Sequence, residues 1–174
     1  MIRQAKLADV DEVEKCYTEV LLYEQIHTAY TVWQLGIYPT RKTAEAALSD
    51  SSLYVMEKSG KICASMIINH YAPEEYDSIK WKGPTNPSEV LIIHLLCVRP
   101  SEAGQGIGKE MVKFAIEEAK RRNCKVVRLD TGSQNIPAKT LYTNLGFKLI
   151  GTTSMAIGGK IPHKNHLFFE LDIR

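Results

Sequence analysis

The sequence predicts an α/β fold in which a mixed, mostly antiparallel central sheet carries helices on both faces. In the first half, apolar runs at residues 53–57 and 62–70 are separated by the turn-forming sequence KSGK, which is typical of an antiparallel hairpin. In the second half, a strand, a helix and another strand follow one another. This order implies a parallel, right-handed crossover, so the sheet should contain both kinds of strand pair.

The first 50 residues predict a short strand and two helices. Residues 2–6 indicate the strand, and Asp9 with Glu12 three residues later has the form of a box that caps a helix. Residues 43–48 favour a second, shorter helix. The first helix is amphipathic because its apolar residues recur at helical spacing: Val10, Val13, Tyr17, Val20 and Leu21.

A long irregular loop precedes the most apolar segment of the chain. Residues 72–88 contain three prolines and a glycine around Trp81, which argues against regular structure, and loops of this length are often functional. Residues 89–98 read EVLIIHLLCV, a nearly unbroken apolar run that suits a strand covered on both faces. Pro100 ends this strand.

The remainder of the chain predicts two helices and three strands. The helix after a glycine-rich turn is apolar on one face and charged on the other, and Asn123 closes it. Residues 126–129 form a strand, and residues 137–145 form a short helix that ends at Gly146. Residues 147–155 and 167–173 complete the sheet.

Length and composition fit one globular domain at residues 1–174. The chain has 174 residues, 44% of them hydrophobic, which is enough to bury a sizeable core. Lys and Arg total 22, and Asp and Glu total 20. The charges are nearly balanced, so they give no indication of a surface that binds nucleic acid or membrane. The sequence opening lacks a signal peptide's apolar core, and no stretch is apolar enough to span a bilayer. We expect a soluble, cytoplasmic protein that binds small molecules or peptides.

Four cysteines are widely spaced and form neither a CxxC pair nor a cluster with histidine at zinc spacing. The spacing predicts no disulfide framework and no metal site. Buried, reduced thiols are the expectation.

The glycine-rich turn at residues 100–109 reads PSEAGQGIGK and joins a buried strand to a helix. Backbone amides and the helix dipole can hold a diphosphate at such a point, and glycines let the backbone approach it. A flexible connector would show the same glycines, so the turn alone leaves both interpretations open.

Two known phosphate motifs do not fit this turn. A Walker A loop needs a glycine where Ala103 stands and a hydroxyl residue where Glu110 stands. A dinucleotide fingerprint that starts at Gly104 fails at Lys109, although Asp130 could contact a ribose at the end of a later strand. An NAD-dependent oxidoreductase is therefore the weaker hypothesis.

The segment VRPSEAGQGIGK resembles the strand end and pyrophosphate loop of the GCN5-related N-acetyltransferase (GNAT) family. A second motif has that family's spacing and consists of Asn135, Ala138, Leu141, Tyr142, Gly146 and Phe147. The resemblance implies a GNAT-like fold and an N-acetyltransferase that uses acetyl-CoA as co-substrate and no metal. Ala103 departs from the pattern, because family members usually have Arg or Gln there, and Gln105 could replace that contact.

Three residues are candidates for the chemistry that the resemblance implies. A primary amine must lose a proton before it attacks a thioester, which costs about 4–5 kcal/mol at neutral pH. His94 can accept it because imidazole titrates near neutral pH, and it is similar to a strand histidine of the arylalkylamine N-acetyltransferases. A hydrogen-bonded core histidine is an equal alternative, and Glu89 is a second candidate base. By resemblance, Tyr142 is the general acid that protonates the departing thiolate.

The resemblance also implies the coenzyme contacts. The backbone of Leu96, Cys97 and Val98 would pair with the pantetheine amides like an added strand, and Asn135 and Tyr142 would lie along the coenzyme arm. The pyrophosphate loop comprises Ala103, Gly104, Gln105, Gly106, Ile107, Gly108 and Lys109. The Cys97 thiol has no evident activating partner, so direct transfer is favoured over an acyl-cysteine intermediate.

The acceptor, a small amine or a peptide, is not identified by the sequence. Its site should lie between the first-half helices, the loop at residues 72–88 and a late hairpin at residues 158–164. Aromatic residues there could line a pocket, although core packing is the commoner role for each: Tyr30, Trp33, Tyr38, Tyr76 and Trp81. A non-catalytic acyl-CoA-binding module is the main alternative to an enzyme, and a homodimer would agree with the resemblance.

Overall fold

Seven strands form one sheet, which confirms the predicted mixed α/β class. The structure is a computed structural model that describes residues 1–84 and 86–174. Within these residues the strand order is β1-β2-β3-β4-β5-β7-β6, and only β4 and β5 pair in parallel. The strands are β1 (Ile2–Gln4), β2 (Leu53–Lys58), β3 (Lys61–Asn69), β4 (Val90–Val98), β5 (Val126–Gly132), β6 (Lys148–Ile157) and β7 (Ile161–Asp172).

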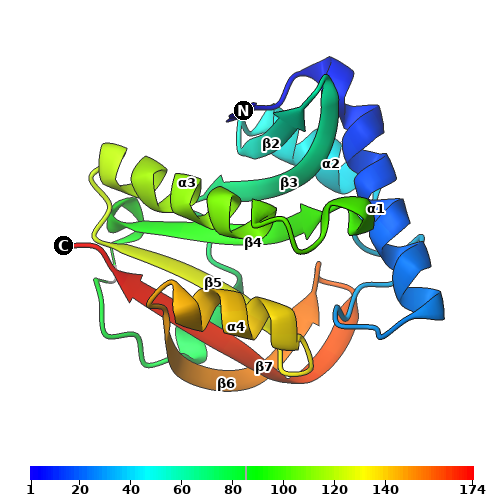
Figure 1. Ribbon diagram of the computed structural model, residues 1–174. Helices are drawn as coiled ribbons and strands as arrows, with labels where there is room; N and C mark the ends of the chain where they lie inside the picture. The colour runs from blue at the N-terminus through cyan, green and yellow to red at the C-terminus, as the bar shows by residue number, and fades with distance from the viewer. Residues whose placement is uncertain (85) are drawn as a thin grey trace.

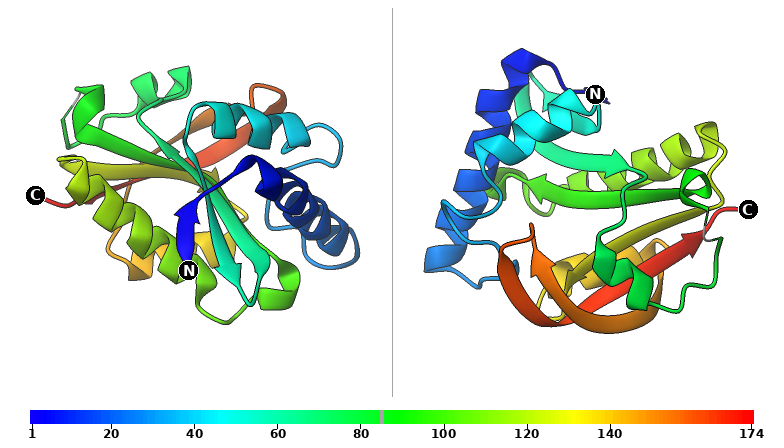
Figure 2. Two further views of the ribbon diagram at one scale, coloured as in Figure 1. Left: turned by 90° about the horizontal axis from the view of Figure 1, so that it is seen from above. Right: turned by 180° about the vertical axis from the view of Figure 1, so that it is seen from behind.

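Helices cover both faces of the sheet. They are α1 (Val10–Ile26), α2 (Arg41–Ser49), α3 (Ile107–Arg121) and α4 (Ile136–Asn144). Figure 1 shows α3 and α4 in front of the sheet, and Figure 2 shows α1 and α2 on the opposite face. The crossover from β4 through α3 to β5 is the one that the sequence predicts.

Each face of the sheet has its own apolar core. The core under α3 and α4 includes Met111, Val112 and Ala115, which have no exposed surface and recur at helical spacing. The core under α1 and α2 includes Val13 and Ala44. A third cluster, which includes Phe168, lies where the loop before β4 packs against the β6–β7 hairpin. All four cysteines are buried and free.

The structure corrects two local predictions. Asp9 does not cap α1 with its side chain, because its carboxylate accepts hydrogen bonds from the Lys6 N–H at 2.7 Å and from the Arg3 guanidinium at 2.7 Å. Strand β7 begins at Ile161 rather than at residue 167. Its first residues pair with β6 but not with β5, and a strand with one free edge tolerates the missing N–H of Pro162.

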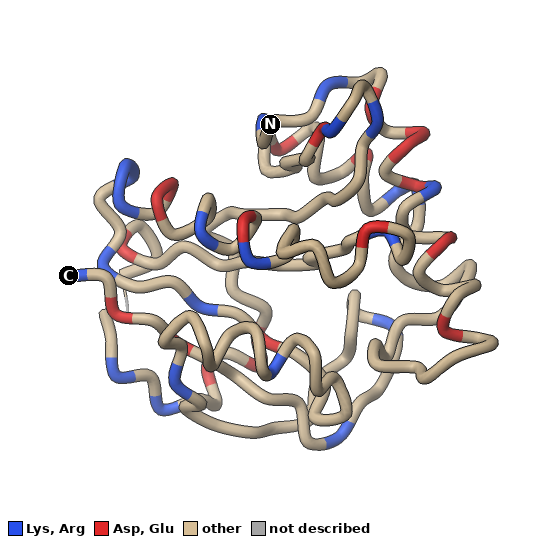
Figure 3. The backbone as a smooth tube through the Cα atoms, viewed as in Figure 1, with Lys and Arg blue, Asp and Glu red and all other residues tan. Residues whose placement is uncertain are grey.

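Charged residues of both signs are interspersed along much of the chain (Figure 3). Exposed ion pairs are common, such as Arg41 with Glu45 on α2. None of the helices in the described part of the chain has both the length and the hydrophobicity that a membrane crossing requires.

A buried ion pair fixes the loop before β4 to the sheet. The Arg128 guanidinium on β5 donates to Glu170 on β7 at 2.8 Å, and their side chains are only 7% and 5% exposed. Glu170 also accepts the N–H of Gly83 at 2.9 Å. A Cβ at position 83 would lie 2.5 Å from Val126, so only glycine allows this approach. Trp81 stacks on Arg128 at 4.3 Å.

We predict that Glu170→Gln lowers the free energy of unfolding by about 3 kcal/mol, because it leaves the buried Arg128 charge without its counter-ion. Urea denaturation would measure this loss. The matched variant Glu45→Gln removes an exposed partner of Arg41 and should cost less than about 1 kcal/mol. Equal losses in the two variants would contradict the role assigned to the buried pair.

Candidate active site

Strands β4 and β5 pair over only four residues of each strand. Their register runs from Val90 opposite Val126 to Ile93 opposite Leu129 and ends there. On its other side, β4 continues along β3 but contains one extra residue, because the pairs change from Ile67–His94 to Ser65–Cys97. This is a β-bulge, and bulges bend a strand and increase its twist. Figure 1 shows the β4 and β5 ribbons diverging toward the ends where α3 and α4 begin.

Leu95 forms the bulge with a left-handed backbone conformation, at φ +48. Its side chain is buried in the core under α1. After the bulge, Cys97 also faces that core, whereas Leu96 and Val98 face the core under α3. Beyond Ile93, the β4 backbone therefore has a partner on β3 and none on β5 among the described residues.

The glycine-rich turn leads from the end of β4 to the start of α3. Ala103 is extended, and Gly104 and Gly106 have φ of +77 and +80, which favour glycine. Residues 103–106 are exposed, and α3 begins at Ile107. The Gln105 side chain accepts a hydrogen bond from Lys58 at 2.6 Å, so it is directed toward the β2–β3 hairpin. Lys109 is exposed on the first turn of α3.

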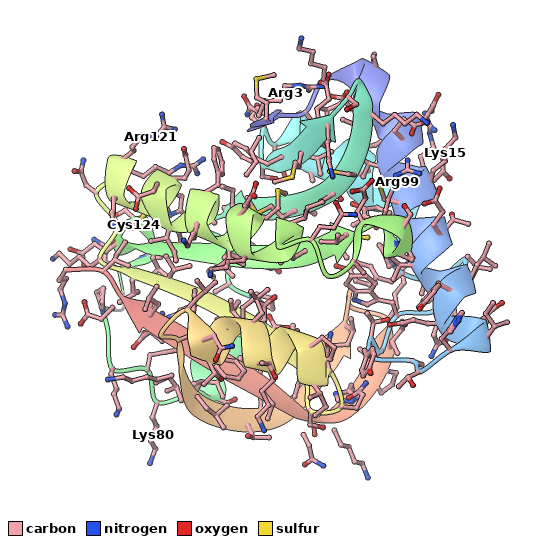
Figure 4. All side chains as sticks on the ribbon, viewed as in Figure 1. Arg3, Lys15, Lys80, Arg99, Arg121 and Cys124 are labelled. Atoms are coloured by element: carbon pink, nitrogen blue, oxygen red, sulfur yellow. The ribbon has the colours of Figure 1, made fainter. Side chains whose placement is uncertain are left out.

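Arg99 fixes the entrance of this turn to α1. Its backbone N–H donates to Cys63 at 2.9 Å, and its guanidinium donates to the Ile62 carbonyl at 2.7 Å and to Glu12 at 2.7 Å. Figure 4 shows Arg99 where the end of β4 meets α1. The turn is thus held at a defined position relative to both elements.

Helix α4 and its N-cap carry two of the predicted residues. The Asn135 side chain caps α4 by accepting the Ala138 N–H at 3.2 Å, so its amide N–H₂ is left to donate elsewhere. Tyr142 is buried, and its ring lies 5.9 Å from that of Phe147 and 6.2 Å from that of Phe169. Burial raises the pKa of Tyr142, and the Asp130 carboxylate raises it further. The phenol is therefore protonated at neutral pH.

His94 is the last β4 residue before the bulge. Its Nε2 lies 3.0 Å from Asn69 Oδ1, which also accepts the Tyr71 N–H, so Nε2 is the donor and Nδ1 holds the lone pair. Burial lowers the pKa of His94, against the opposing effects of the Asp130 carboxylate and the Tyr71 carbonyl. A neutral imidazole of this kind can accept a proton.

Glu89 and Cys97 lie in surroundings that differ from those of His94. Glu89 precedes β4 and forms an ion pair with Lys125, at the end of the strand opposite the glycine-rich turn. Cys97 is buried, and burial raises the pKa of its thiol well above the ordinary value. A thiol in this state is a poor nucleophile.

Asp130, which the sequence predicts to contact a ribose only in a dinucleotide-binding fold, has a different environment in the structure. Its carboxylate accepts hydrogen bonds from Tyr76 and from His166, each at 2.8 Å. A sheet with one parallel pair also differs from a doubly wound dinucleotide fold. Two residues proposed for a pocket wall, Tyr76 and Trp81, instead pack with Phe168.

A surface hollow of about 630 Å³ lies between the start of α1 and the β2–β3 hairpin, and Arg99 is part of its lining whereas His94 and Tyr142 are not. Its lining includes Arg3, Glu12 and Glu57, which already form ion pairs with neighbouring side chains. Among residues 1–84 and 86–174, no group of three or more His, Cys, Asp or Glu side chains is arranged to hold a metal ion.

Comparison with known proteins connects this arrangement to one family. The model of the acetyltransferase (GNAT) family matches residues 18–147. A 68-residue segment is 38% identical to an uncharacterised N-acetyltransferase of Methanocaldococcus jannaschii and covers 39% of this chain and 30% of that protein. A 55-residue segment is 36% identical to N-alpha-acetyltransferase 30 of Saccharomyces cerevisiae and covers 32% of this chain and 31% of that protein. The matches thus span about a third of the length of these relatives.

Among solved structures, an acetyltransferase of the GNAT family from Streptococcus agalactiae superposes with a TM-score of 0.84 at 18% identity, covering 100% of this chain and 95% of that one. The acetyltransferase yncA from Salmonella typhimurium was solved with its cofactor acetyl-CoA. It has a TM-score of 0.72 at 20% identity, and the match covers 100% of this chain and 94% of that one. At these identities the likeness establishes a shared fold.

We predict that the His94 imidazole has a pKa below about 6.5, the ordinary value. A titration of the histidine ring signals by NMR, assigned with His94→Gln, would measure it. The unfolded chain binds this proton more tightly, so His94 adds stability above about pH 6.5 that is lost as the pH falls. The variant should therefore lose less stability on acidification. A pKa at or above 6.5 would contradict the effect assigned to the partial burial of the imidazole.

Proposed function

The chain belongs to the acetyltransferase (GNAT) family, and on this premise we propose that it is an N-acetyltransferase that moves the acetyl group of acetyl-CoA directly to a primary amine. One observation carries the proposal. The β4 backbone after His94 lacks a partner on β5 in the described chain, and this edge lies beside the glycine-rich start of α3. A free strand edge and a helix N-terminus are the two features that an extended, diphosphate-bearing coenzyme requires.

In this proposal the coenzyme lies along the free edge of β4. The peptide groups of Leu96, Cys97 and Val98 pair with the pantetheine amides. The backbone N–H groups of residues 103–109 receive the diphosphate, and Lys109 adds positive charge. The Asn135 amide donates to the coenzyme arm. The Salmonella protein of similar fold was solved with acetyl-CoA, which supports the same co-substrate here.

The neutral His94 and the protonated Tyr142 have complementary roles in the proposed transfer. The thioester supplies an electrophilic carbonyl carbon. His94 takes one proton from the acceptor's ammonium group, and the resulting amine forms the C–N bond as the C–S bond breaks. Tyr142 donates its proton to the departing sulfur and regains one from the nitrogen of the new amide. His94 releases its proton to solvent, so each transfer yields an amide, a free thiol and one proton.

His94 is preferred to Glu89 as the base because of position. Glu89 precedes Val90, whereas the unpaired edge of β4 begins after Ile93, and Lys125 already neutralises Glu89. A base must come within hydrogen-bond reach of the proton that it removes. His94, directly before the bulge, meets that requirement better.

We predict that Tyr142→Phe lowers kcat about 100-fold, because the leaving thiolate loses its proton donor. Thiol release from acetyl-CoA across a panel of amines, amino acids and peptides would measure it. Tyr23→Phe, which removes a hydroxyl from the end of α1, is the matched control and should retain full activity. Unchanged turnover in Tyr142→Phe would exclude the acid role. Saturable acetyl-CoA binding without release on any amine would favour a non-catalytic acyl-CoA-binding module.

We also predict that Gly106→Ala raises the dissociation constant for acetyl-CoA about 10-fold. The left-handed backbone at φ +80 costs a residue with a Cβ about 1–2 kcal/mol, and relief of this strain moves the N–H groups at the start of α3. Calorimetric titration would measure the affinity. Gly36→Ala carries similar strain at φ +77, also without a close neighbour, and should leave coenzyme affinity unchanged.

A further inference from the structure

A partly buried carboxylate lies on β5 directly beyond its last pair with β4. The final pair is Ile93 with Leu129, so His94 and Asp130 are the next residues on the two strands. Paired residues of adjacent strands share a face, and Ile92 belongs to the cluster on the α1 side of the sheet. Because side chains alternate, His94 and Asp130 both face that side, opposite α3 and α4. The Asp130 side chain is 14% exposed.

Two buried groups fix the orientation of Asp130. Tyr76 donates its hydroxyl hydrogen to Oδ2 at 2.8 Å, and His166 donates from Nε2 to Oδ1 at 2.8 Å. His166 is in turn oriented by His163, with 3.1 Å between their Nδ1 atoms. Each oxygen of the Asp130 carboxylate thus accepts one hydrogen bond and can accept another. The carboxylate is held rigidly and keeps capacity for a ligand.

Asp130 also lacks the arginine partner that the buried carboxylates have, and its neighbour in ion-pair range is His166. Asp9, Glu118 and Glu170 each pair with an arginine. Within the described chain, no Lys or Arg lies within ion-pair distance of Asp130, and Arg128 on the same face is bound to Glu170. Buried charges are normally paired, so this site favours a cation from outside the chain.

The field of Asp130 extends to both proposed catalytic groups. It raises the pKa of Tyr142 and opposes the lowering of the pKa of His94. It also raises the pKa of Tyr38, which lies beside the β6–β7 hairpin. A cation held at Asp130 would therefore lie close to the point of transfer.

We propose that Asp130 binds the ammonium group of the acceptor, and that the acceptor is an aliphatic primary amine without an anionic group beside its nitrogen. This inference rests on the proposed function and names its substrate class. A charge-assisted hydrogen bond to Asp130 holds the nitrogen near His94, which then takes the proton. An α-amino acid is disfavoured because its carboxylate would lie against that of Asp130.

The test measures amine binding without turnover. n-Butylamine hydrochloride is titrated into the protein at constant pH and ionic strength, and the ring signals of His94 and His166 are followed by NMR. n-Butanol is the uncharged match. The amine should give a saturable shift that the alcohol does not give. Asp130→Asn, which preserves shape, should raise the dissociation constant for the amine at least about 10-fold. Glu75→Gln, a carboxylate-to-amide change on the loop before β4, should leave it unchanged.

Equal responses to amine and alcohol, or unchanged amine affinity in a folded Asp130→Asn variant, would overturn the inference. Circular dichroism melting would establish that this variant is folded. A thiol-release assay on the same proteins tests the transfer separately. Amine binding that depends on Asp130 without thiol release would support the inference and contradict the proposed reaction. Turnover with an unchanged KM for amines in Asp130→Asn would support the proposed reaction and contradict the inference.

Discussion

The extra residue in β4 is the constraint on which the rest of the site depends. The left-handed backbone at Leu95 costs about 1–2 kcal/mol, and burial of its side chain under α1 compensates for that cost. Because β4 bends at this point, its pairing with β5 ends after Ile93. One local distortion thereby frees a strand edge, directs it toward the start of α3 and leaves His94 beside Asp130.

Burial favours the uncharged form of both proposed catalytic groups, which leaves one of them able to accept a proton and the other able to donate one. Removal from water disfavours the charged form of any group, so it keeps the imidazole of His94 neutral and the phenol of Tyr142 protonated. A base must be unprotonated and an acid must be protonated before the reaction begins. Removal from water therefore prepares both groups, while the Asp130 carboxylate limits the lowering of the His94 pKa and raises the Tyr142 pKa further.

Much of the fold was predictable because its signals are local. Alternation and helical spacing identified the strands and helices, and the glycines identified the turn before α3. The bulge in β4 was not predictable, because EVLIIHLLCV contains no glycine or turn residue and the register of β4 depends on its pairing with β3. The surroundings of Asp130 were missed since Tyr76 and His166 lie 54 and 36 residues away in sequence. The predicted substitute for the Ala103 contact, Gln105, is held by Lys58 from another hairpin, which no local pattern reveals.

The interrupted ladder between β4 and β5 also bears on how long the protein survives in a cell. In the proposed binding mode, the coenzyme would pair with β4 beyond Ile93, where β5 no longer does. A ligand that binds only the folded state adds RT ln(1 + [L]/Kd) to its stability. Since unfolded chains are removed by proteases, abundance would follow the supply of the coenzyme, and a starved cell would hold fewer copies without any change in gene expression.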